Sequence, residues 1–317
     1  MHVASAPAPS PKKRSLLQSF DFLGILAIHG GTVWAFYRGA TWSLVGIALA
    51  TYVLRMFAIT AVYHRYFGHR AYKTSRPFQF LLALLGTTAT QKGPLWWAGT
   101  HRIHHKYSDT EKDVHSPLRR GFYWSHMGWW LSNEHENSPH DTIRDYAKFP
   151  ELRFLDRFHL VGPALIIGAT LAFGFDVFLW GYVVSTCVLM HATFTINSLA
   201  HVWGARRYAT TDTSRNNPWL AILTLGEGWH NNHHHYMASA NQGFFWWEID
   251  VSYYVLRALA AVGLVWDLRK VPDHVKTRDL VRVVGERAPL LLAKAGEPAA
   301  PDSAPAPVVG AVDEAAA

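Results

Sequence analysis

The sequence predicts an all-α integral membrane protein, with four transmembrane helices in two hairpins and a polar helical cap on one side. The first observation is composition. Half of the 317 residues are hydrophobic, although 30 Lys and Arg and 23 Asp and Glu are also present. The mean hydropathy is close to zero, which indicates strongly apolar segments alternating with strongly polar ones. The second observation is that four long apolar runs occur as two closely spaced pairs.

Each of the four runs is long enough, at about 18 residues or more, to cross the hydrocarbon core of a bilayer. The expected spans cover residues 20–37, 41–63, 158–175 and 177–199. The cap would consist of residues 64–157 and 200–295, within one domain of residues 16–295. Residues 1–15 are predicted to be a disordered basic tail and residues 296–317 a disordered Ala/Pro-rich tail.

Two details of the apolar segments give further expectations. The run at 78–89 has about a dozen residues, too few to span a bilayer, so we expect a buried or re-entrant helix. Arg55 is the one charge in the second span. We expect its side chain to snorkel to the cytoplasmic surface rather than face the protein interior.

The distribution of basic residues predicts the orientation in the membrane. Four spans place both termini and both cap segments on one side, and the opposite turns carry only Arg38. The basic residues on the shared side are Lys12, Lys13, Arg14, Arg119, Arg120, Arg206 and Arg207. By the positive-inside rule that side is cytoplasmic, as in a multi-pass protein of a bacterial-type inner membrane. Membrane lipid is an expected partner and nucleic acid is not, because no basic face interleaved with aromatic residues occurs.

Histidine is the unusual residue, with 19 copies, and five consecutive positions are the most informative. In His101-Arg102-Ile103-His104-His105, helical geometry puts the first and last histidines about 40° apart on one face and turns His104 about 100° away from His105. Such a turn can give two ligands to one metal ion and a third to a second ion. A solvated histidine cluster on a basic surface is the alternative for this motif alone.

Three further groups fall on the same side of the predicted membrane. His230, His233 and His234 repeat the spacing above, and Asn197 and His201 are four residues apart at the end of the last span. The remaining pair, five residues apart, is poor for one face of an ideal helix, so we expect it to flank a helix end where Gly68 eases the bend. That pair is His64 and His69.

Together these nine histidines suffice for two metal ions with four or five ligands each. We expect His101 and His105 on one ion and His104 on the other. The other histidines lack ligand spacing and are interpreted as structural, with His235 as a borderline residue that could support a ligand. Carboxylates close enough in sequence to fix the ligand rings are Asp109, Glu111, Asp113 and Glu227, although surface solvation explains them equally well. The single cysteine, Cys187, leads us to expect neither an internal disulfide nor a cysteine metal site.

The motifs HRYFGH, HRIHH, NSLAH and HNNHH, in this order between two pairs of spans, resemble those of the membrane fatty acid desaturases. The acyl-CoA Δ9 (stearoyl-CoA) desaturases are the most similar group. The similarity extends to HRAYKTSRPFQF, HHKYSDTEKDVHSP, RRGFYWSHMGW and LGEGWHNNHHHY, over roughly residues 40 to 270.

The resemblance implies an O₂-dependent oxidoreductase that inserts a cis double bond, at Δ9, into a saturated long-chain acyl thioester. Two ferrous ions would be held in the cap, with Asn197 binding one of them through a water molecule. The implied histidine ligands are His64, His69, His101, His104, His105, His201, His230, His233 and His234. A narrow bent tunnel would take the acyl chain past the metals, and Gln91, Trp97 and Thr193 match positions that line its bend.

The carrier expected from the resemblance is coenzyme A, with acyl carrier protein or a membrane lipid as alternatives. Arg119 and Arg120 could bind a carrier phosphate, although ordinary surface charge explains them equally well. Two positions depart from the animal acyl-CoA enzymes: Gly99 stands where they carry an arginine, and Lys92 replaces an uncharged polar residue.

This chemistry fits the residues. Removing hydrogen from an unactivated methylene requires an oxidising metal centre, whereas positioning one C–C bond and excluding water are tasks of the protein. The chain has no C-x-x-C-H haem motif, and one cysteine cannot hold an iron–sulfur cluster. We therefore expect an external electron donor, such as ferredoxin, rubredoxin or a cytochrome b5-type protein with its reductase.

Two other functions use similar residues. A membrane di-iron hydroxylase or alkane monooxygenase shares the histidine chemistry and would release an oxygenated product. A histidine-rich membrane metal transporter belongs to another class. Transporters place ionisable ligands within the spans near the midplane, whereas the histidines here lie at the predicted cytoplasmic ends.

Overall fold

The computed structural model describes residues 16–281 with the exception of residue 133. The predicted tails at 1–15 and 296–317, and residues 282–295 of the predicted domain, lie outside these described residues. Within them the fold is helical, and the only strands are the two-residue segments β1 (Lys73–Thr74) and β2 (Val265–Trp266), which pair antiparallel.

Two continuous helical runs in the described part are long and apolar enough to cross a membrane. The first, Trp42–Gly68, has 27 residues and the second, Phe175–Val202, has 28. The first covers the predicted span 41–63 from residue 42 onward and the second contains the predicted span 177–199, so both predictions agree with the structure in place and type. The first run joins α2 (Trp42–Phe57) to η1 (Ala58–Gly68), and the second joins α9 (Phe175–Phe178), η4 (Leu179–Val184), α10 (Ser185–Asn197) and α11 (Leu199–Val202).

The other two predicted spans differ from the expectation. Residues 158–175 contain only the 12-residue helix α8 (Val161–Ala172), which is bent by 65° from α7 (Pro150–Arg157) and would give a third crossing if the bent pair is one span. Twelve helical residues rise about 18 Å, less than the roughly 30 Å hydrocarbon core. The predicted span 20–37 lies inside α1 (Leu16–Arg38), which is not among the helices of crossing length and hydropathy. The four-span arrangement therefore stays a prediction.

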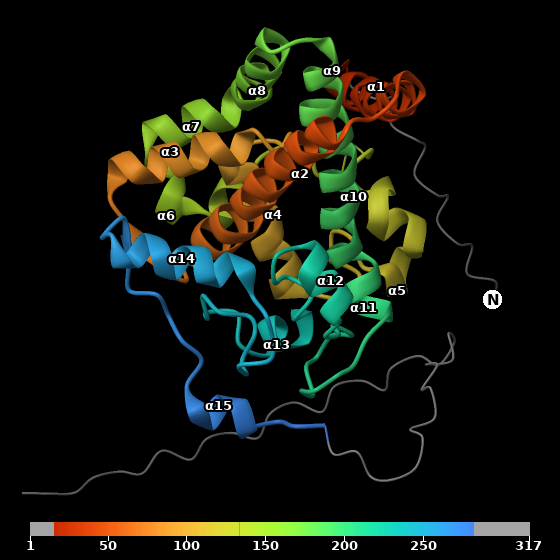
Figure 1. Ribbon diagram of the computed structural model, residues 1–317. Helices are drawn as coiled ribbons and strands as arrows, with labels where there is room; N and C mark the ends of the chain where they lie inside the picture. Colours follow the sequence, from red (N-terminus) through yellow and green to blue (C-terminus); the bar gives the residue numbers. More distant parts are fainter. Residues whose placement is uncertain (1–15, 133, 282–317) are drawn as a thin grey trace, which may run out of the picture. The chain divides into compact units, whose positions relative to one another are not determined.

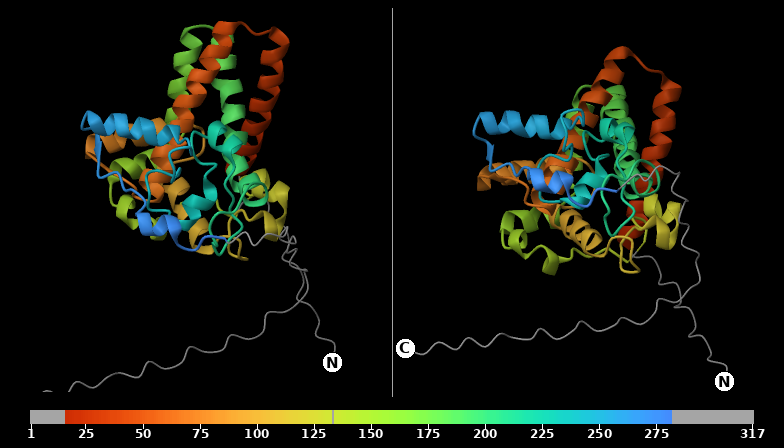
Figure 2. Two further views of the ribbon diagram at one scale, coloured as in Figure 1. Left: turned by 60° about the horizontal axis from the view of Figure 1, so that its bottom comes forward. Right: turned by 90° about the horizontal axis from the view of Figure 1, so that it is seen from below.

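The long helices nevertheless stand together on one side of the molecule. Helix α2 packs against η4 and α10, and α1 packs against η4. Figure 2, left, shows α1, α2, α8 and the α9–α10 run rising side by side from the remaining elements. This arrangement is that of a helical bundle carrying a cap.

The cap is built from short helices joined by long loops (Figure 1). The predicted short helix at 78–89 is α3 (Arg76–Thr87), whose N-terminus is capped by the Ser75 hydroxyl accepting from the backbone N–H of Phe78. The other cap helices are α4 (Pro94–Tyr107), α5 (Pro117–Arg120), η2 (Trp124–Gly128), η3 (His140–Thr142), α6 (Arg144–Ala147), α12 (Pro218–Leu223), α13 (His230–His235), α14 (Val251–Ala261) and α15 (Asp273–Thr277).

The snorkelling expected for Arg55 is wrong. Its side chain is fully buried, and its guanidinium donates to the Thr186 hydroxyl at 2.6 Å, to the Ser185 hydroxyl, and to the carbonyl oxygen of Thr51 at 3.2 Å. Because α2 turns this residue toward α10, hydroxyl and carbonyl acceptors satisfy the guanidinium inside the bundle, and it has no need to reach water.

Candidate metal centre

The first ligand pair is set by an unusual helix. In η1 the backbone N–H of His69 donates to the carbonyl oxygen of His64 at 3.1 Å, a five-residue step characteristic of a π-helix. This step stacks the two residues one turn apart, and their ring centroids are 4.9 Å from each other. His69 does follow the helix end, as expected, and the π-helical step accommodates a spacing that is poor for one face of an α-helix.

Helix α4 carries the central motif and is fixed at both ends. At its start, the Asp156 carboxylate accepts from the backbone N–H groups of Leu95 at 2.9 Å and Trp96 at 2.8 Å. Near its end, the Arg102 guanidinium donates to the carbonyl oxygens of Phe67 at 2.7 Å and Gly68 at 2.9 Å. These bonds dock α4 against the end of η1, where His69 emerges.

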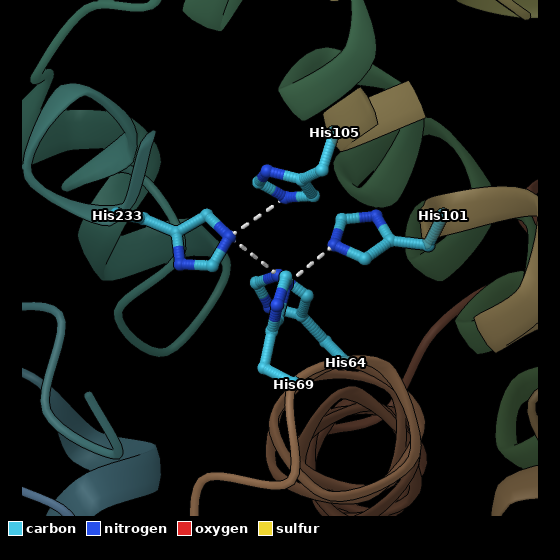
Figure 3. A group of neighbouring side chains, drawn as sticks. All are labelled: His64, His69, His101, His105 and His233. Atoms are coloured by element: carbon cyan, nitrogen blue, oxygen red, sulfur yellow. Dashed lines mark hydrogen bonds between the residues drawn. The ribbon is translucent and has the colours of Figure 1, made fainter. Parts of the chain in front are cut away.

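Five histidines converge in what we call the five-histidine group, and one ring nitrogen from each lies within 4.8 Å of the others. The closest pairs of Nε2 atoms are 2.8 Å apart for His69 and His101, 3.0 Å for His64 and His233, and 2.9 Å for His105 and His233. Figure 3 shows the five rings pointing toward a common centre from η1, its end, α4 and α13.

A second cluster, the four-histidine group, meets the same distance criterion. Its members are His104, His201, His230 and His234. The Nε2 atom of His230 lies 3.1 Å from the Nε2 atoms of both His201 and His234. The Nε2 atom of His104 is buried and has no hydrogen-bond partner. An unpaired buried nitrogen costs free energy, which coordination of a metal ion would remove.

The two groups divide the motif histidines in the pattern that helical geometry predicts. His101 and His105 lie in the five-histidine group and His104 in the four-histidine group; likewise His230 and His234 share one group and His233 joins the other.

Buried carboxylates orient four of the rings. The Nδ1 atom of His64 is 2.5 Å from Glu227, that of His104 is 2.9 Å from Asp113, and that of His234 is 2.7 Å from Asp212. His201 has a longer contact, 3.3 Å, with Asp109. A carboxylate accepting from Nδ1–H fixes the tautomer in which the Nε2 lone pair faces the centre, as in metal sites.

Three of the four carboxylates expected from sequence make these contacts, and Glu111 does not. Glu111 is an exposed residue that pairs with Arg119 at 3.2 Å. The carboxylate that sequence reasoning missed is Asp212. It lies 22 residues before His234 in an irregular segment, so no helical spacing links the two.

Electrostatics favour neutral imidazoles at most of these positions. Burial, reinforced by the neighbouring histidines, lowers the pKa values of His69, His101, His105, His230 and His233 well below the usual 6.5. Burial also lowers the pKa of His234, to about 4, although Asp212 opposes the shift. His104 is the exception: burial opposes it, but Asp113 raises its pKa. Neutral rings are the form that coordinates a cation.

The carboxylates keep their charge. Burial by itself would raise the pKa values of Asp109 and Asp113, but hydrogen bonds and charge interactions with His201 and His104 hold them well below the ordinary range. In the same way, His64 and Arg65 lower the pKa of Glu227 to about 2.

A cavity opens onto both groups. Its wall includes His64, His101, His104, His230 and Asn197, together with apolar residues of η1 and α10. A second cavity shares His101 and Asn197 with the first. Asn197 lines both cavities.

The three residues expected at a tunnel bend are joined to one another. The Gln91 amide donates to the Thr193 hydroxyl at 3.0 Å, and the Trp97 indole N–H contacts the Gln91 carbonyl oxygen at 3.3 Å. Trp97 and Thr193 line both cavities, and the Trp97 ring stacks on His101 with centroids 5.2 Å apart. A molecule in this space would therefore pass directly beside the five-histidine group.

The residues expected near the carrier lie elsewhere. Arg119 pairs with Glu111, and Arg120 pairs with Glu134 at 3.0 Å while its guanidinium lies over the Trp124 ring. Neither arginine lines the two cavities. Lys92 lies 3.7 Å from Asp21 and over the Trp96 ring.

Three of the histidines interpreted as structural lie near the centre or in contact with each other: His115, His29 and His191. His115 stacks on His104, with ring centroids 4.3 Å apart, and lines both cavities. His191 meets His29 outside the two groups. His235 instead stacks on Tyr208 and bonds to the carbonyl of Val275, away from the ligands.

Fold and site together define a membrane-associated helical protein with two adjacent histidine clusters that fit metal ions. Imidazole nitrogen suits Fe, Zn, Cu and Ni, and the carboxylate-oriented rings match the usual surroundings of metal-bound histidine.

Comparison with known proteins gives the family. The chain matches the sequence profile "Fatty acid desaturase" over residues 40–276, so it belongs to the fatty acid desaturase family and is an oxidoreductase of lipid metabolism. It is 38% identical over 251 residues to Delta-9 acyl-lipid desaturase 2 of Arabidopsis thaliana, covering 77% of this chain and 80% of that protein. It is 37% identical to the sn-1 stearoyl-lipid 9-desaturase of Anabaena variabilis, covering 78% and 92%. It is 36% identical to the acyl-CoA C20 Delta5-desaturase of Anemone leveillei, covering 83% and 86%.

Proposed function

We propose that this protein is an O₂-dependent di-iron desaturase that inserts a cis double bond at Δ9 of a saturated long-chain acyl group. The observation that supports the proposal is the pair of histidine groups that face a common cavity. One turn of α4 contributes histidines to both groups. Five nitrogen donors and four nitrogen donors make two neighbouring sites, which is the arrangement a dinuclear centre needs.

The five-histidine group would hold one iron and the four-histidine group the other, with Asn197 reaching one of them through water. Iron bound there would supply the oxidising power to remove two hydrogens from an unactivated C–C bond, using O₂ and two electrons.

The protein's own contribution is positioning. Met56, Ile59 and Ile196 give the cavity an apolar wall, and Trp97 stacked on His101 limits how a chain can pass the five-histidine group. The hydrogen bonds of Gln91 to Thr193 and to Trp97 fix this wall, so one C–C bond of an extended chain can be held beside the metals. Most of the residues that line the cavity are buried.

Coenzyme A is the carrier proposed from the resemblance, and a membrane lipid is a second candidate with its own support. Both arginines proposed to meet a carrier phosphate are already paired with carboxylates. At Gly99, a Cβ atom would lie 2.8 Å from Pro139, so this backbone has no room for the arginine of the animal enzymes unless Pro139 moves. The relatives' names are mixed, since two are lipid desaturases and one acts on acyl-CoA.

The proposal also includes the environment of the enzyme. Four spans would place the metal centre and both termini on the cytoplasmic side of an inner membrane, where an external donor such as ferredoxin, rubredoxin or a cytochrome b5-type protein supplies electrons. The single cysteine of the chain supports an external donor, because it leaves no iron–sulfur cluster within the chain.

Expression in a desaturase-deficient host tests the function. Gas chromatography of the fatty acids, with location of the double bond, should show a new Δ9 monounsaturated product that the His104→Ala variant does not make. An oxygenated product would identify a hydroxylase instead, and profiles identical to that of the variant would refute the proposal.

A second measurement separates the carriers. Membranes containing the enzyme receive either stearoyl-CoA or a labelled stearoyl lipid, with a reducing system and O₂, and each acyl pool is analysed after a short incubation. Product appearing first in the CoA pool supports acyl-CoA, and product appearing first in the lipid pool overturns it.

A further inference from the structure

A third cluster of ligand-type side chains lies outside the two histidine groups. His29 on α1 faces Cys187 and His191 on α10, and one ligand atom of each residue lies within 4.8 Å of the other two. Cys187 and His191 are four residues apart, so they share one face of α10. Helices α1 and α10 pack together, which brings His29 to this face.

The nitrogen geometry repeats that of the histidine groups. The Nε2 atoms of His29 and His191 are 2.9 Å apart, within the range of 2.8 to 3.1 Å found there. The Nδ1 atom of His29 lies 2.7 Å from the carbonyl oxygen of Ile25, and the Nδ1 atom of His191 lies 3.0 Å from the Nε2 atom of His126. The His29 ring thus has a backbone carbonyl as outer partner, as metal-bound histidines commonly have, and the outer partner of His191 is a third imidazole.

The contacts of these rings form a series that has one proton too few. It runs from the Ile25 carbonyl through His29, His191 and His126 to the Ser198 hydroxyl, and from there to the Phe194 carbonyl. Three neutral imidazoles and one hydroxyl bring four protons to these five contacts. Both ends are carbonyl oxygens, which only accept, so one contact lacks a proton unless a cation is present.

We propose that His29, Cys187 and His191 form a third metal site, which takes Zn²⁺ or a similar borderline to soft divalent cation. Two imidazoles and one thiolate suit such ions and not Mg²⁺ or Ca²⁺, which prefer oxygen ligands. The ion lies at the contact between the two Nε2 atoms and completes the hydrogen-bond chain. The bound ion also clamps α1 to α10.

The proposed site departs from the expectation that a single cysteine excludes a cysteine metal site. That expectation holds for sites built from several cysteines. Here two histidines, one from a different helix, supply the remaining ligands, and only the packing of α1 on α10 brings them together. The site is independent of the proposed desaturation, because none of its residues belongs to the two histidine groups.

The experiment uses the fact that Cys187 is the only cysteine of the chain. Full-length protein without a polyhistidine tag is titrated with Co²⁺, and thiolate-to-metal charge-transfer absorption is recorded in the near ultraviolet. Ions in the two histidine groups cannot contribute, because those groups contain no sulfur. The band should saturate at one ion per chain, vanish in Cys187→Ser and weaken strongly in His29→Ala. It should persist in His274→Ala, which removes an exposed histidine of α15.

A second measurement needs no variant. Zn²⁺ should slow alkylation of Cys187 in the wild-type protein by about tenfold or more, because a metal-bound thiolate is shielded from the reagent. Absence of the charge-transfer band together with an unchanged alkylation rate would overturn the site, and would mean that the contact holds a proton instead. Iron content of the same samples, measured in parallel, reports on the two histidine groups separately.

Discussion

The backbone N–H of His69 donates to the carbonyl oxygen of His64, five residues earlier, at 3.1 Å. The π-helical step turns a spacing that is unfavourable in an α-helix into a matched pair of imidazoles on one side of the five-histidine group. It also brings Gly68 against His101, where a Cβ atom would lie 3.2 Å from the imidazole Cδ2 atom.

The exchange variant Gly68→His/His69→Gly tests this geometry without changing composition. A histidine at position 68 would be four residues from His64, the spacing that an α-helix favours, but here it would meet the His101 ring. We expect iron content measured by elemental analysis to fall from about two ions per chain toward one. Retention of both ions would show that the π-helical step is not what positions His69.

The carboxylate that only the structure reveals should matter for metal affinity. Asp212→Asn weakens the hold on the Nδ1–H of His234, and loss of such an outer partner typically reduces metal affinity by about 10–100-fold. Competition with a chelator should show faster loss of one iron of the two. The matched control Asp273→Asn removes an exposed carboxylate and should leave retention unchanged. Equal retention in both variants would argue against a supporting role for Asp212.

Arg65 should be important for stability, because it is buried and paired with two carboxylates. Its guanidinium contacts Glu227 at 2.9 Å and Asp250 at 2.8 Å. Arg65→Met leaves both carboxylates without their cation, which in buried pairs costs about 3–5 kcal/mol. Arg76→Met, which breaks an exposed pair with Glu151, should cost less than about 1 kcal/mol.

Unfolding in detergent, followed by circular dichroism, compares these two arginine variants with the wild type. Because Glu227 also contacts His64, the Arg65 variant should lose iron as well as stability. Equal unfolding midpoints for the two variants would contradict the importance given to the buried network.

The metal-free protein should lose stability as the pH falls below about 6.5, the ordinary histidine value. Histidines with depressed native pKa values bind protons more readily in the unfolded chain, so each destabilises the fold by up to about 1.4 kcal/mol per pH unit below that value. For His234 the effect continues down to about pH 4. His104, with a raised pKa, acts in the opposite direction and opposes the trend.

Unfolding midpoints of chelator-treated protein between pH 7.5 and 5.5 measure this pH dependence, and the same acidification should release iron from the loaded protein. Asp109 and Asp113 stay ionised throughout this range and add no slope. A midpoint that rises on acidification would show that the buried rings are already protonated at neutral pH.

The wall residue Trp97 should control where the chain is attacked. Trp97→Ala removes a side chain that lines both cavities and breaks its contact with Gln91. The acyl chain can then shift along the cavity relative to the metals. We expect a mixture of double-bond positions and a turnover reduced by about tenfold or more, since small misplacements are costly. Trp219→Ala, an exposed control on α12, should give the wild-type product. A single unchanged product from Trp97→Ala would remove this residue from the positioning wall.

The sequence by itself determined the helical class, two membrane-length runs, and the division of the motif histidines between two groups. These features follow from local rules: apolar run length, and the angle between residues on one helix. His101 and His105 lie in one group because residues four apart share a face of a helix. His104 lies in the other group because it is turned about 100° away from His105.

Only the tertiary structure decided what depends on contacts between distant segments. Asp212 contacts the Nδ1 atom of His234, Arg55 donates to hydroxyls of α10, and His29 lies beside Cys187. Each contact forms because packing brings distant helices and loops together. No spacing in the sequence encodes these pairings. The five-residue step at His69 likewise escaped prediction, because an α-helix and a π-helix differ by one hydrogen-bond register that composition does not specify.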